Sequence, residues 1–405
     1  MLASAVALFG VLTAANLRLF GSLLAPIYLT FAIEFFLRTL IGYVAYYYLF
    51  PSDLGDPAFL DSALLLSMLY AATFFAGVAV ANAPLERLVT RISSLSVTSS
   101  NERAGAMALP SAMTALAVGL LALAGLAVFG GGGTLWVTDT RAAYLTYRSG
   151  FGFLWSLFAS SIPLSMLLLV HLGKVRLGWR YLLVVPAYLM LAYFTGSKQT
   201  LLAVVFALLV YRHYYVRPLS TARLGVVFGL LGFSFVATTI LQGSFETLFE
   251  AMSYFDYIHV TAKYLEASNS LSAIRGLGVA SYLWSFVPRG LLTGKPFEYG
   301  TVLINSYLFP GAAEQGYTPA FLEWALAHLD AGFLGVAALG FLKGQVVSSF
   351  FRVWQRNLDN LFLFLFNCQL GFMVFNMPGV YELALLLALG TAWSLKKLSA
   401  YRVVI

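Results

Sequence analysis

The sequence predicts an all-α integral membrane protein with about eleven transmembrane helices, and three observations support this. Of the 405 residues, 60% are hydrophobic and only 10% are charged, whereas soluble globular chains carry roughly 25% charged residues. The mean hydropathy is +0.84, and apolar runs of about 17–25 residues, the length of a spanning helix, recur along the chain. Aromatic residues make up 16% of the chain, which is typical of proteins with aromatic belts at the membrane surfaces.

This composition excludes a water-soluble enzyme, a disordered chain and a nucleic-acid-binding protein, although the formal net charge is +7. The single cysteine, Cys368, excludes a disulfide framework and a thiolate metal cluster. The histidines show neither HxxxH nor HExxH spacing. We therefore expect no cofactor, no metal ion and no nucleic acid, and the lipid bilayer is the first partner that the composition implies.

The predicted spans follow the apolar runs of the sequence. These runs fall near residues 2–17, 23–49, 59–83, 105–130, 151–173, 180–196, 199–216, 224–242, 321–343, 357–376 and 380–396. They define an N-terminal bundle of about eight spans over residues 1–242, one large connection over residues 243–320, and about three C-terminal spans over residues 321–405. We call residues 243–320 the connecting segment.

Lysine and arginine predict the orientation, because cytoplasmic loops carry an excess of them. They crowd into every second loop, at Arg18, Arg87, Arg91, Arg103, Lys174, Arg176, Arg180, Arg212, Arg217, Arg223, Arg352, Arg356, Lys396, Lys397 and Arg402. With eleven spans this pattern places the C-terminus inside, the N-terminus outside and the connecting segment outside. The net positive charge is thus mainly a topology signal.

The first part of the connecting segment has the pattern of an amphipathic helix over residues 244–266. Apolar residues recur at helical spacing, at Phe245, Leu248, Phe249, Met252, Phe255, Ala262 and Leu265. Charged residues occupy another face, at Glu246, Glu250, Lys263 and Glu266. This pattern predicts an amphipathic helix that lies on the outer leaflet. A docking helix without chemistry is the open alternative.

Two cations follow where prolines and glycines fix the path of the chain. Arg289 comes directly after Pro288, and Lys295 lies between Gly294 and Pro296. Cations held by a rigid loop at a membrane surface suit a phosphate or diphosphate, which arginine binds bidentately. The alternative is contact with lipid headgroups, which basic interfacial residues commonly make.

Glu323 lies where the chain re-enters the membrane. It is seven residues before Asp330, so a continuous helix would place both carboxylates on one face. A carboxylate near the start of a span is costly unless it is paired or functional. Glu323 is therefore a candidate general base that accepts a proton from a hydroxyl. An ion pair with Arg289 or Lys295 is the alternative, and the two are compatible.

Three further cations fall on the expected outer side. Arg141 and Arg148 follow the fourth span, and Lys198 lies in the tight hairpin between spans six and seven, near a helix N-terminus that favours anions. Together with Arg289, Lys295 and Glu323, they fit a polyanionic headgroup reached from the outer leaflet. Glu34 and Arg38, four residues apart in the second span, are interpreted as a mainly structural ion pair.

One part of the chain carries a family resemblance. Residues 276–296 read GLGVASYLWSFVPRGLLTGKP, and residues 318–344 read TPAFLEWALAHLDAGFLGVAALGFLKG. This order of Ser-Tyr, Pro-Arg, Lys-Pro, Pro, Glu and a glycine-spaced helix resembles the bacterial oligosaccharide repeat-unit polymerases, the Wzy-type O-antigen and capsule polymerases. The turn at residues 196–198 also resembles the family's Gly-Ser-Arg turn, but Lys198 replaces the arginine.

The resemblance implies a glycosyltransferase of the GT-C type in the bacterial inner membrane, with its active site facing the periplasm. Such an enzyme joins undecaprenyl diphosphate-linked oligosaccharide repeats and releases undecaprenyl diphosphate, without a metal ion. We expect Arg289 and Lys295, helped by Arg141, Arg148 and Lys198, to bind the diphosphate, and Glu323 to act as the base. Aromatic residues expected to contact sugar or lipid are Tyr282, Trp284, Tyr299 and Tyr317. A chain-length regulator is a candidate protein partner.

Two other functions stay open. An O-antigen ligase would transfer finished polymer to the lipid A core, but ligases carry a His-Asn pair after the large loop, and here His328 is followed by Leu329. A lipid-linked oligosaccharide flippase or other transporter would show repeated halves and charged or broken helices at mid-membrane. The sequence shows no such repeat, and its candidate charges lie on the outer side.

Overall fold

The computed structural model describes residues 1–50, 55–96, 98, 108–129, 135, 138, 140–172, 181–196, 198–241, 257–281, 301–311, 320–367 and 389–397. Throughout these residues the regular structure is helical, apart from an isolated antiparallel bridge between Thr98 and Asn360. The prediction of an all-helical chain is confirmed. The chain divides into two compact units: unit 1 contains Met1–Ala81 and Leu219–Ser348, and unit 2 contains Asn82–Pro218 and Ser349–Ile405.

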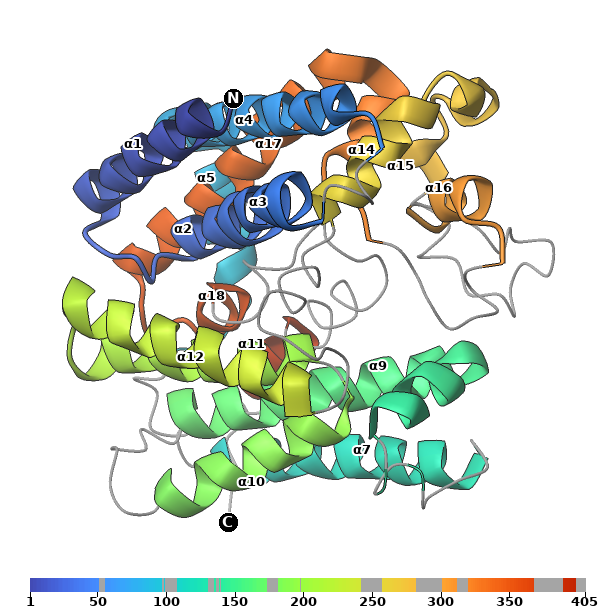
Figure 1. Cartoon of the computed structure of the whole chain (residues 1–405). Coiled ribbons are helices and arrows are strands. Elements are labelled where there is room, and N and C mark those ends of the chain that lie inside the picture. The colour runs from blue at the N-terminus through green and yellow to red at the C-terminus, as the bar shows by residue number, and fades with distance from the viewer. Residues whose placement is uncertain are drawn as a thin grey trace, which may run out of the picture. The chain divides into compact units, whose positions relative to one another are not determined.

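Unit 1 contains the N-terminal helices, the described part of the connecting segment and most of the long helix α17 (Figure 1). Its elements are α1 (Leu2–Phe20), α2 (Pro26–Phe31), η1 (Ala32–Ile41), α3 (Gly42–Val44), η2 (Ala45–Leu49), α4 (Pro57–Ala79), α12 (Thr221–Leu241), α14 (Tyr257–Ala267), η6 (Ser270–Ile274), α15 (Gly278–Ser281), α16 (Thr301–Leu308) and α17 (Ala325–Arg356). The segments η1 and η2 are π-helical, and η6 is a 3₁₀ helix.

Unit 2 contains the middle of the chain and its C-terminal end, including the last turns of α17. Its other elements are α5 (Ala83–Ser93), α7 (Ala108–Phe129), α9 (Thr140–Leu172), α10 (Tyr181–Phe194), α11 (Lys198–Tyr211), η4 (Arg212–Val216), α18 (Leu361–Leu365) and a helical stretch at residues 389–397. Helix α7 packs against α9 around Leu126 and Trp155. Glu86 of α5 forms an ion pair with Arg356, with 2.8 Å between Glu86 Oε2 and Arg356 Nη1.

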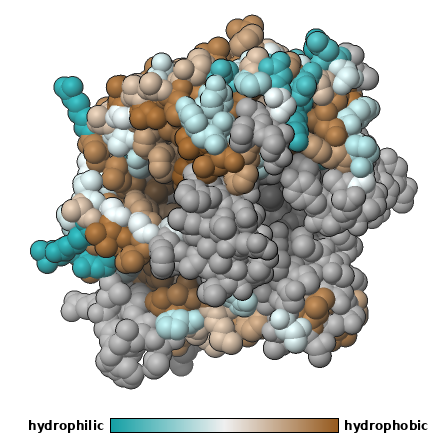
Figure 2. Space-filling view, in the orientation of Figure 1, coloured by the Kyte–Doolittle hydropathy of each residue, from teal (hydrophilic) through white to brown (hydrophobic). Residues whose placement is uncertain are grey.

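Six helices are long and apolar enough to cross a membrane, among the residues that the structure describes. They are Leu2–Phe20, Pro26–Leu49, Pro57–Ala79, Leu109–Phe129, Leu154–His171 and Ala325–Arg356. Apolar side chains are exposed along them, and Figure 2 shows hydrophobic surface over much of the described part. The protein is therefore a multi-pass helical membrane protein.

The number of eleven spans stays a prediction. The apolar runs at 180–196, 199–216 and 224–242 correspond to shorter apolar helices, Val184–Phe194, Val204–Val216 and Thr221–Leu230. The runs at 357–376 and 380–396 are described only over residues 357–367 and 389–396.

Helix α14 covers the second half of the amphipathic helix expected over residues 244–266, whose first half lies outside the described residues. The predicted polarity of its faces is confirmed: Ala262 and Leu265 are buried, and Lys263 and Glu266 are exposed. The buried side packs against α4, α3 and η1. In the described half, therefore, the apolar face contacts protein helices of unit 1.

Helices α4 and α17 approach each other closely at glycines. A Cβ atom added to Gly344 would lie 2.0 Å from the main-chain oxygen of Phe74, and one added to Gly77 would lie 2.1 Å from that of Phe341. Contacts this short leave no room for a side chain. Small residues at helix interfaces let two backbones approach, which is a common basis of packing between membrane helices.

Gly344→Ala is expected to destabilise unit 1 by about 1–3 kcal/mol, because the added methyl group pushes α17 away from α4. The matched control is Gly10→Ala on α1, where an added Cβ meets nothing within 4 Å, so the change is neutral or mildly stabilising. The unfolding midpoint of each variant in detergent, followed by tryptophan fluorescence, gives the comparison. Equal midpoints for the two variants would contradict the close contact.

Helix α17 is broken near its start. Ala331 and Gly332 have non-helical dihedral angles, and Gly332 has φ 57° and ψ −141°, a conformation essentially restricted to glycine. Residues 325–330 then fold back on the following helix, since a Cβ added to Gly335 would lie 1.9 Å from the oxygen of Ala327. The predicted single span over 321–343 is therefore wrong in its bounds: the long helical stretch begins after the break.

Candidate functional site

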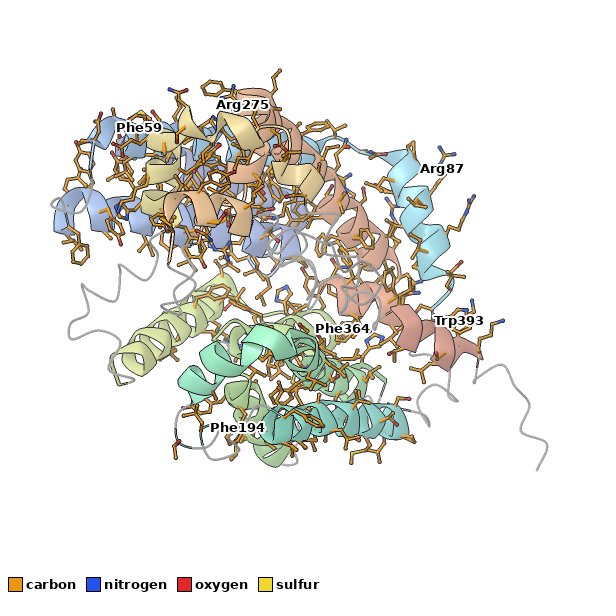
Figure 3. All side chains as sticks on the ribbon, turned by 90° about the vertical axis from the view of Figure 1, so that its right-hand side faces the viewer. Phe59, Arg87, Phe194, Arg275, Phe364 and Trp393 are labelled. Atoms are coloured by element: carbon orange, nitrogen blue, oxygen red, sulfur yellow. The ribbon has the colours of Figure 1, made fainter. Side chains whose placement is uncertain are left out.

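A cluster of charged side chains lies in the interior of unit 1. It consists of Glu34 and Arg38 on η1, Glu323 in the turn before α17, and Lys343 on α17, and Tyr70 of α4 joins them. Glu34 is 4% exposed and Lys343 is 1% exposed. Figure 3 shows the dense side-chain packing of this unit, with Phe59 of α4 and Arg275 labelled. We call these five residues the buried charge cluster.

Lys343 and Glu323 form the centre of the cluster. The Lys343 ammonium donates to both carboxylate oxygens of Glu323, and the Tyr70 hydroxyl donates to Oε2 at 3.2 Å. The side chain of Glu323 is 2% exposed. A carboxylate so buried needs a cation or several donors to stay ionised, and this one has both.

The described ion-pair partner of Glu323 is Lys343, whereas the two predicted partners lie outside the described residues. The sequence offered Arg289 or Lys295 as its ion-pair partner, but Lys343 occupies that position in the structure. An unbroken helix would separate residues 323 and 343 by about 30 Å. They meet because the break at Gly332 folds residues 325–330 back along the helix that carries Lys343.

Glu323 and Asp330 do not share a helix face, so that prediction is wrong. Helix α17 begins at Ala325, which leaves Glu323 in the preceding turn. The Asp330 carboxylate instead accepts the main-chain N–H of Gly278, at 2.8 Å from Oδ1. Asp330 thus ties α15 to α17, while Glu323 belongs to the buried charge cluster.

The predicted pair of Glu34 and Arg38 is confirmed, with 2.8 Å between Arg38 Nη1 and Glu34 Oε2. The other carboxylate oxygen of Glu34 accepts the main-chain N–H of Glu323 at 2.8 Å. Arg38 also stacks on Tyr257, with 4.5 Å between its Cζ atom and the ring centroid. The pair therefore contacts both α14 and the turn before α17, contacts that its sequence spacing does not indicate.

The turn that carries Glu323 is held by side chains from several helices. The N–H of Leu322 donates to Thr261 Oγ1 on α14 at 2.9 Å. The Trp324 indole donates to Ser67 Oγ on α4 at 3.1 Å. The first bond satisfies a main-chain donor of the turn and the second ties a side chain to α4, so the position of the turn depends on its neighbours.

A second polar contact lies between α14 and α17. The Tyr264 hydroxyl and His328 Nδ1 are 2.9 Å apart. Burial raises the pKa of the Tyr264 phenol, which keeps the hydroxyl protonated and able to donate to the imidazole. His328, which the sequence considered because of the ligase His-Asn motif, thus takes part in helix packing.

The predicted diphosphate-binding residues are described only in part. Arg289 and Lys295 lie outside the described residues, as do the aromatic candidates Tyr282, Trp284, Tyr299 and Tyr317. Arg141 and Arg148 lie on α9, and Lys198 begins α11, all three in unit 2. For these three residues the structure gives the backbone position only, so the predicted cation site stays a prediction.

Sequence reasoning missed Lys343 and Tyr70 as members of the site. A signal for Lys343 was present, because an ionisable residue within a long apolar helix is rare and is paired or functional by default. Tyr70 gives no such signal, since tyrosine is common in this chain. Within the described parts of the chain, no group of three His, Cys, Asp or Glu side chains is placed to hold a metal ion.

The cluster can carry out two kinds of chemistry. Its two carboxylates and two cations give a formal charge of zero, which makes burial tolerable. An ionised Glu323 can accept a proton, and the adjacent Lys343 can stabilise negative charge nearby. Comparisons of the chain with models of protein families, with curated proteins and with solved structures found no match.

Proposed function

We propose that the protein is a glycosyltransferase that polymerises undecaprenyl diphosphate-linked oligosaccharide repeat units into a surface polysaccharide, at the periplasmic face of the bacterial inner membrane. The observation that carries the proposal is the position of Glu323. It belongs to the second stretch of the polymerase-like pattern, after the stretch that contains Arg289 and Lys295, and its carboxylate lies in the buried charge cluster of a membrane-spanning unit.

In the proposed reaction, a hydroxyl of the acceptor unit attacks the anomeric carbon of the donor. The new glycosidic bond forms as the bond from that carbon to the diphosphate oxygen breaks, and undecaprenyl diphosphate leaves. Glu323 accepts the hydroxyl proton. Arg289 and Lys295, helped by Arg141, Arg148 and Lys198, neutralise the charge that develops on the leaving group, which is commonly the largest contribution to catalysis.

The contacts of Glu323 support its assignment as the base in one respect. Without a cation, a carboxylate in this interior would take up a proton and lose its basicity. Lys343 donates to both of its oxygens, which favours the ionised form against the effect of burial. In this proposal Lys343 is a positioning residue, because it acts through Glu323.

A transporter of lipid-linked oligosaccharides is the second candidate, and two observations favour it. The buried charge cluster includes side chains of membrane-spanning helices, and α17 is broken at Gly332. Transporters commonly build their sites from discontinuous helices and buried ionisable residues. A transporter would move the lipid-linked unit across the membrane without forming a glycosidic bond.

The test uses purified protein in nanodiscs with a lipid diphosphate-linked repeat unit from the source strain, and a gel that resolves the products. The proposal expects a ladder of polymers. Arg289→Ala should lower its rate roughly 30- to 1,000-fold, which corresponds to about 2–4 kcal/mol of lost transition-state stabilisation. Arg275→Ala, a change at an exposed arginine outside the proposed site, serves as the matched control and should leave the rate unchanged.

Three other outcomes would contradict the proposal. Transfer of polymer to a different acceptor, with no ladder, would identify a ligase. Movement of the lipid across a liposome membrane without any transfer would identify a transporter. A ladder reduced equally in Arg275→Ala and Arg289→Ala would contradict the assignment of Arg289 as a diphosphate-binding residue.

A further inference from the structure

The first described helix of the connecting segment and the turn that follows the segment both contact the same short stretch of η1. At the beginning, Tyr257 opens α14, and its ring lies under the Arg38 guanidinium, 4.5 Å from the centroid to Cζ. Three residues after the segment ends, the main-chain N–H of Glu323 donates to Glu34 at 2.8 Å. Glu34 and Arg38 are one helical turn apart, so one pair of side chains reaches both α14 and the turn at Glu323.

The Glu34 carboxylate joins Arg38 to the main chain of Glu323. Glu34 Oε2 accepts from Arg38 and Oε1 accepts from the main chain of Glu323, so each oxygen has a different donor. Arg38 fixes the direction in which the carboxylate points, and the carboxylate fixes the main chain beside the candidate base. A buried ion pair stabilises a fold little more than apolar residues of the same volume do. The distinct effect of this pair is therefore to set the orientation of the Glu34 carboxylate and of the main chain that donates to it.

The stretch of η1 that carries the pair is unusual in itself. It is a π-helix over Ala32–Ile41, and π-helical stretches are rare and often lie at functional sites. The Thr39 hydroxyl donates to the main-chain oxygen of Glu34 at 3.0 Å. Thr39 and Leu40 are buried as well. The part of η1 that carries Glu34 therefore packs into the core of unit 1.

We propose that Glu34 and Arg38 are positioning residues, which hold the start of α14 and the turn at residues 322–324 on η1 and thereby fix Glu323 for proton transfer. They act through Glu323 and touch no substrate. The role in the reaction rests on the function proposed above, whereas the anchoring of the turn at residues 322–324 does not.

Amide hydrogen exchange tests the anchoring without any substrate. The measurement uses the full-length protein in nanodiscs, with exchange resolved to single residues by fragmentation. In Glu34→Ala the amide of Glu323 loses its acceptor, and its exchange should rise about 5- to 100-fold. The amide of Leu322, which donates to Thr261, should stay protected and serves as an internal control. Thr261→Val should give the reverse pattern.

A second set of variants separates the acceptor from the charge. Glu34→Gln with Arg38→Gln removes both charges but retains an oxygen for the N–H of Glu323, so protection should remain within about threefold of wild type. Glu34→Leu with Arg38→Met removes the charges and the acceptor together, and protection should be lost. Because both double variants are neutral, neither leaves a buried charge without its partner.

Activity provides the second measurement. Glu34→Ala should lower kcat for ladder formation at least tenfold and leave KM for the lipid-linked donor within about twofold, because the change disturbs the base and not donor binding. The Gln/Gln variant should restore most of kcat. This rescue is an effect that a merely structural role of the charge pair would not produce.

The outcomes are distinguishable. Unchanged exchange at Glu323 in Glu34→Ala overturns the anchoring, and raised exchange with an unchanged kcat overturns the positioning role. Raised exchange at Leu322 and Glu323 alike shows general loosening and also overturns the proposal. If the wild-type protein forms no ladder, the proposed function fails, and the exchange pattern alone still confirms or overturns the anchoring.

Discussion

Replacing Glu323 by glutamine is expected to lower the rate of polymer formation roughly 10²- to 10⁴-fold, the usual loss when a general base is removed. Glutamine has nearly the same shape and still accepts the hydrogen bond from Tyr70, but it cannot take up the proton of the acceptor hydroxyl. Initial rates from the product ladder, at saturating donor, measure the effect. The rate should fall through kcat, with little change in KM.

The substitution also leaves Lys343 without its carboxylate, so a stability control is needed. The double variant Glu323→Gln with Lys343→Met removes both charges of the buried pair and should unfold near the wild-type midpoint. If Glu323 is the base, this double variant stays inactive although it is stable. A stable double variant with a rate close to wild type would leave Glu323 with a role in ion pairing only.

Replacing Lys343 alone by methionine is expected to destabilise the protein by about 3–5 kcal/mol. The change leaves the Glu323 carboxylate buried and uncompensated, and removal of one partner of a buried pair commonly has an effect of this size. The free energy of unfolding, followed by tryptophan fluorescence during denaturation in mixed micelles, measures it. The double variant described above should recover most of the loss.

The matched control for this change is Lys263→Met. Lys263 lies on α14 in the same unit, but its side chain is exposed, so the substitution should change the free energy of unfolding by no more than about 0.5 kcal/mol. A Lys343→Met variant as stable as Lys263→Met would mean that water reaches Glu323, and that burial does not govern its chemistry.

Much of the fold follows from composition and local pattern. The low share of charged residues and the long apolar runs predict a helical membrane protein, and α1, α4 and α7 lie where the first, third and fourth runs place them. This succeeds because a spanning segment must satisfy its own main-chain hydrogen bonds, so length and polarity alone identify it. The full set of eleven spans and the external position of the connecting segment stay predictions.

The candidate site could be predicted only in fragments. Glu34 and Arg38 were paired correctly because helical spacing brings residues four apart together. Glu323 was singled out because a carboxylate near a span is costly. The sequence could not indicate that these fragments meet, since residues 34 and 323 are 289 positions apart and neither apolar pattern specifies which helices pack together.

The sequence by itself determined that this chain is helical, lies in a membrane and buries a few ionisable groups, because hydropathy and helical spacing are local properties. Only the tertiary structure decided that Lys343 is the cation beside Glu323. That pairing depends on the positive-φ conformation of Gly332, which breaks α17 and reverses the chain. A glycine in a glycine-rich helix gives no sign of such a break, since packing against neighbouring helices selects the conformation.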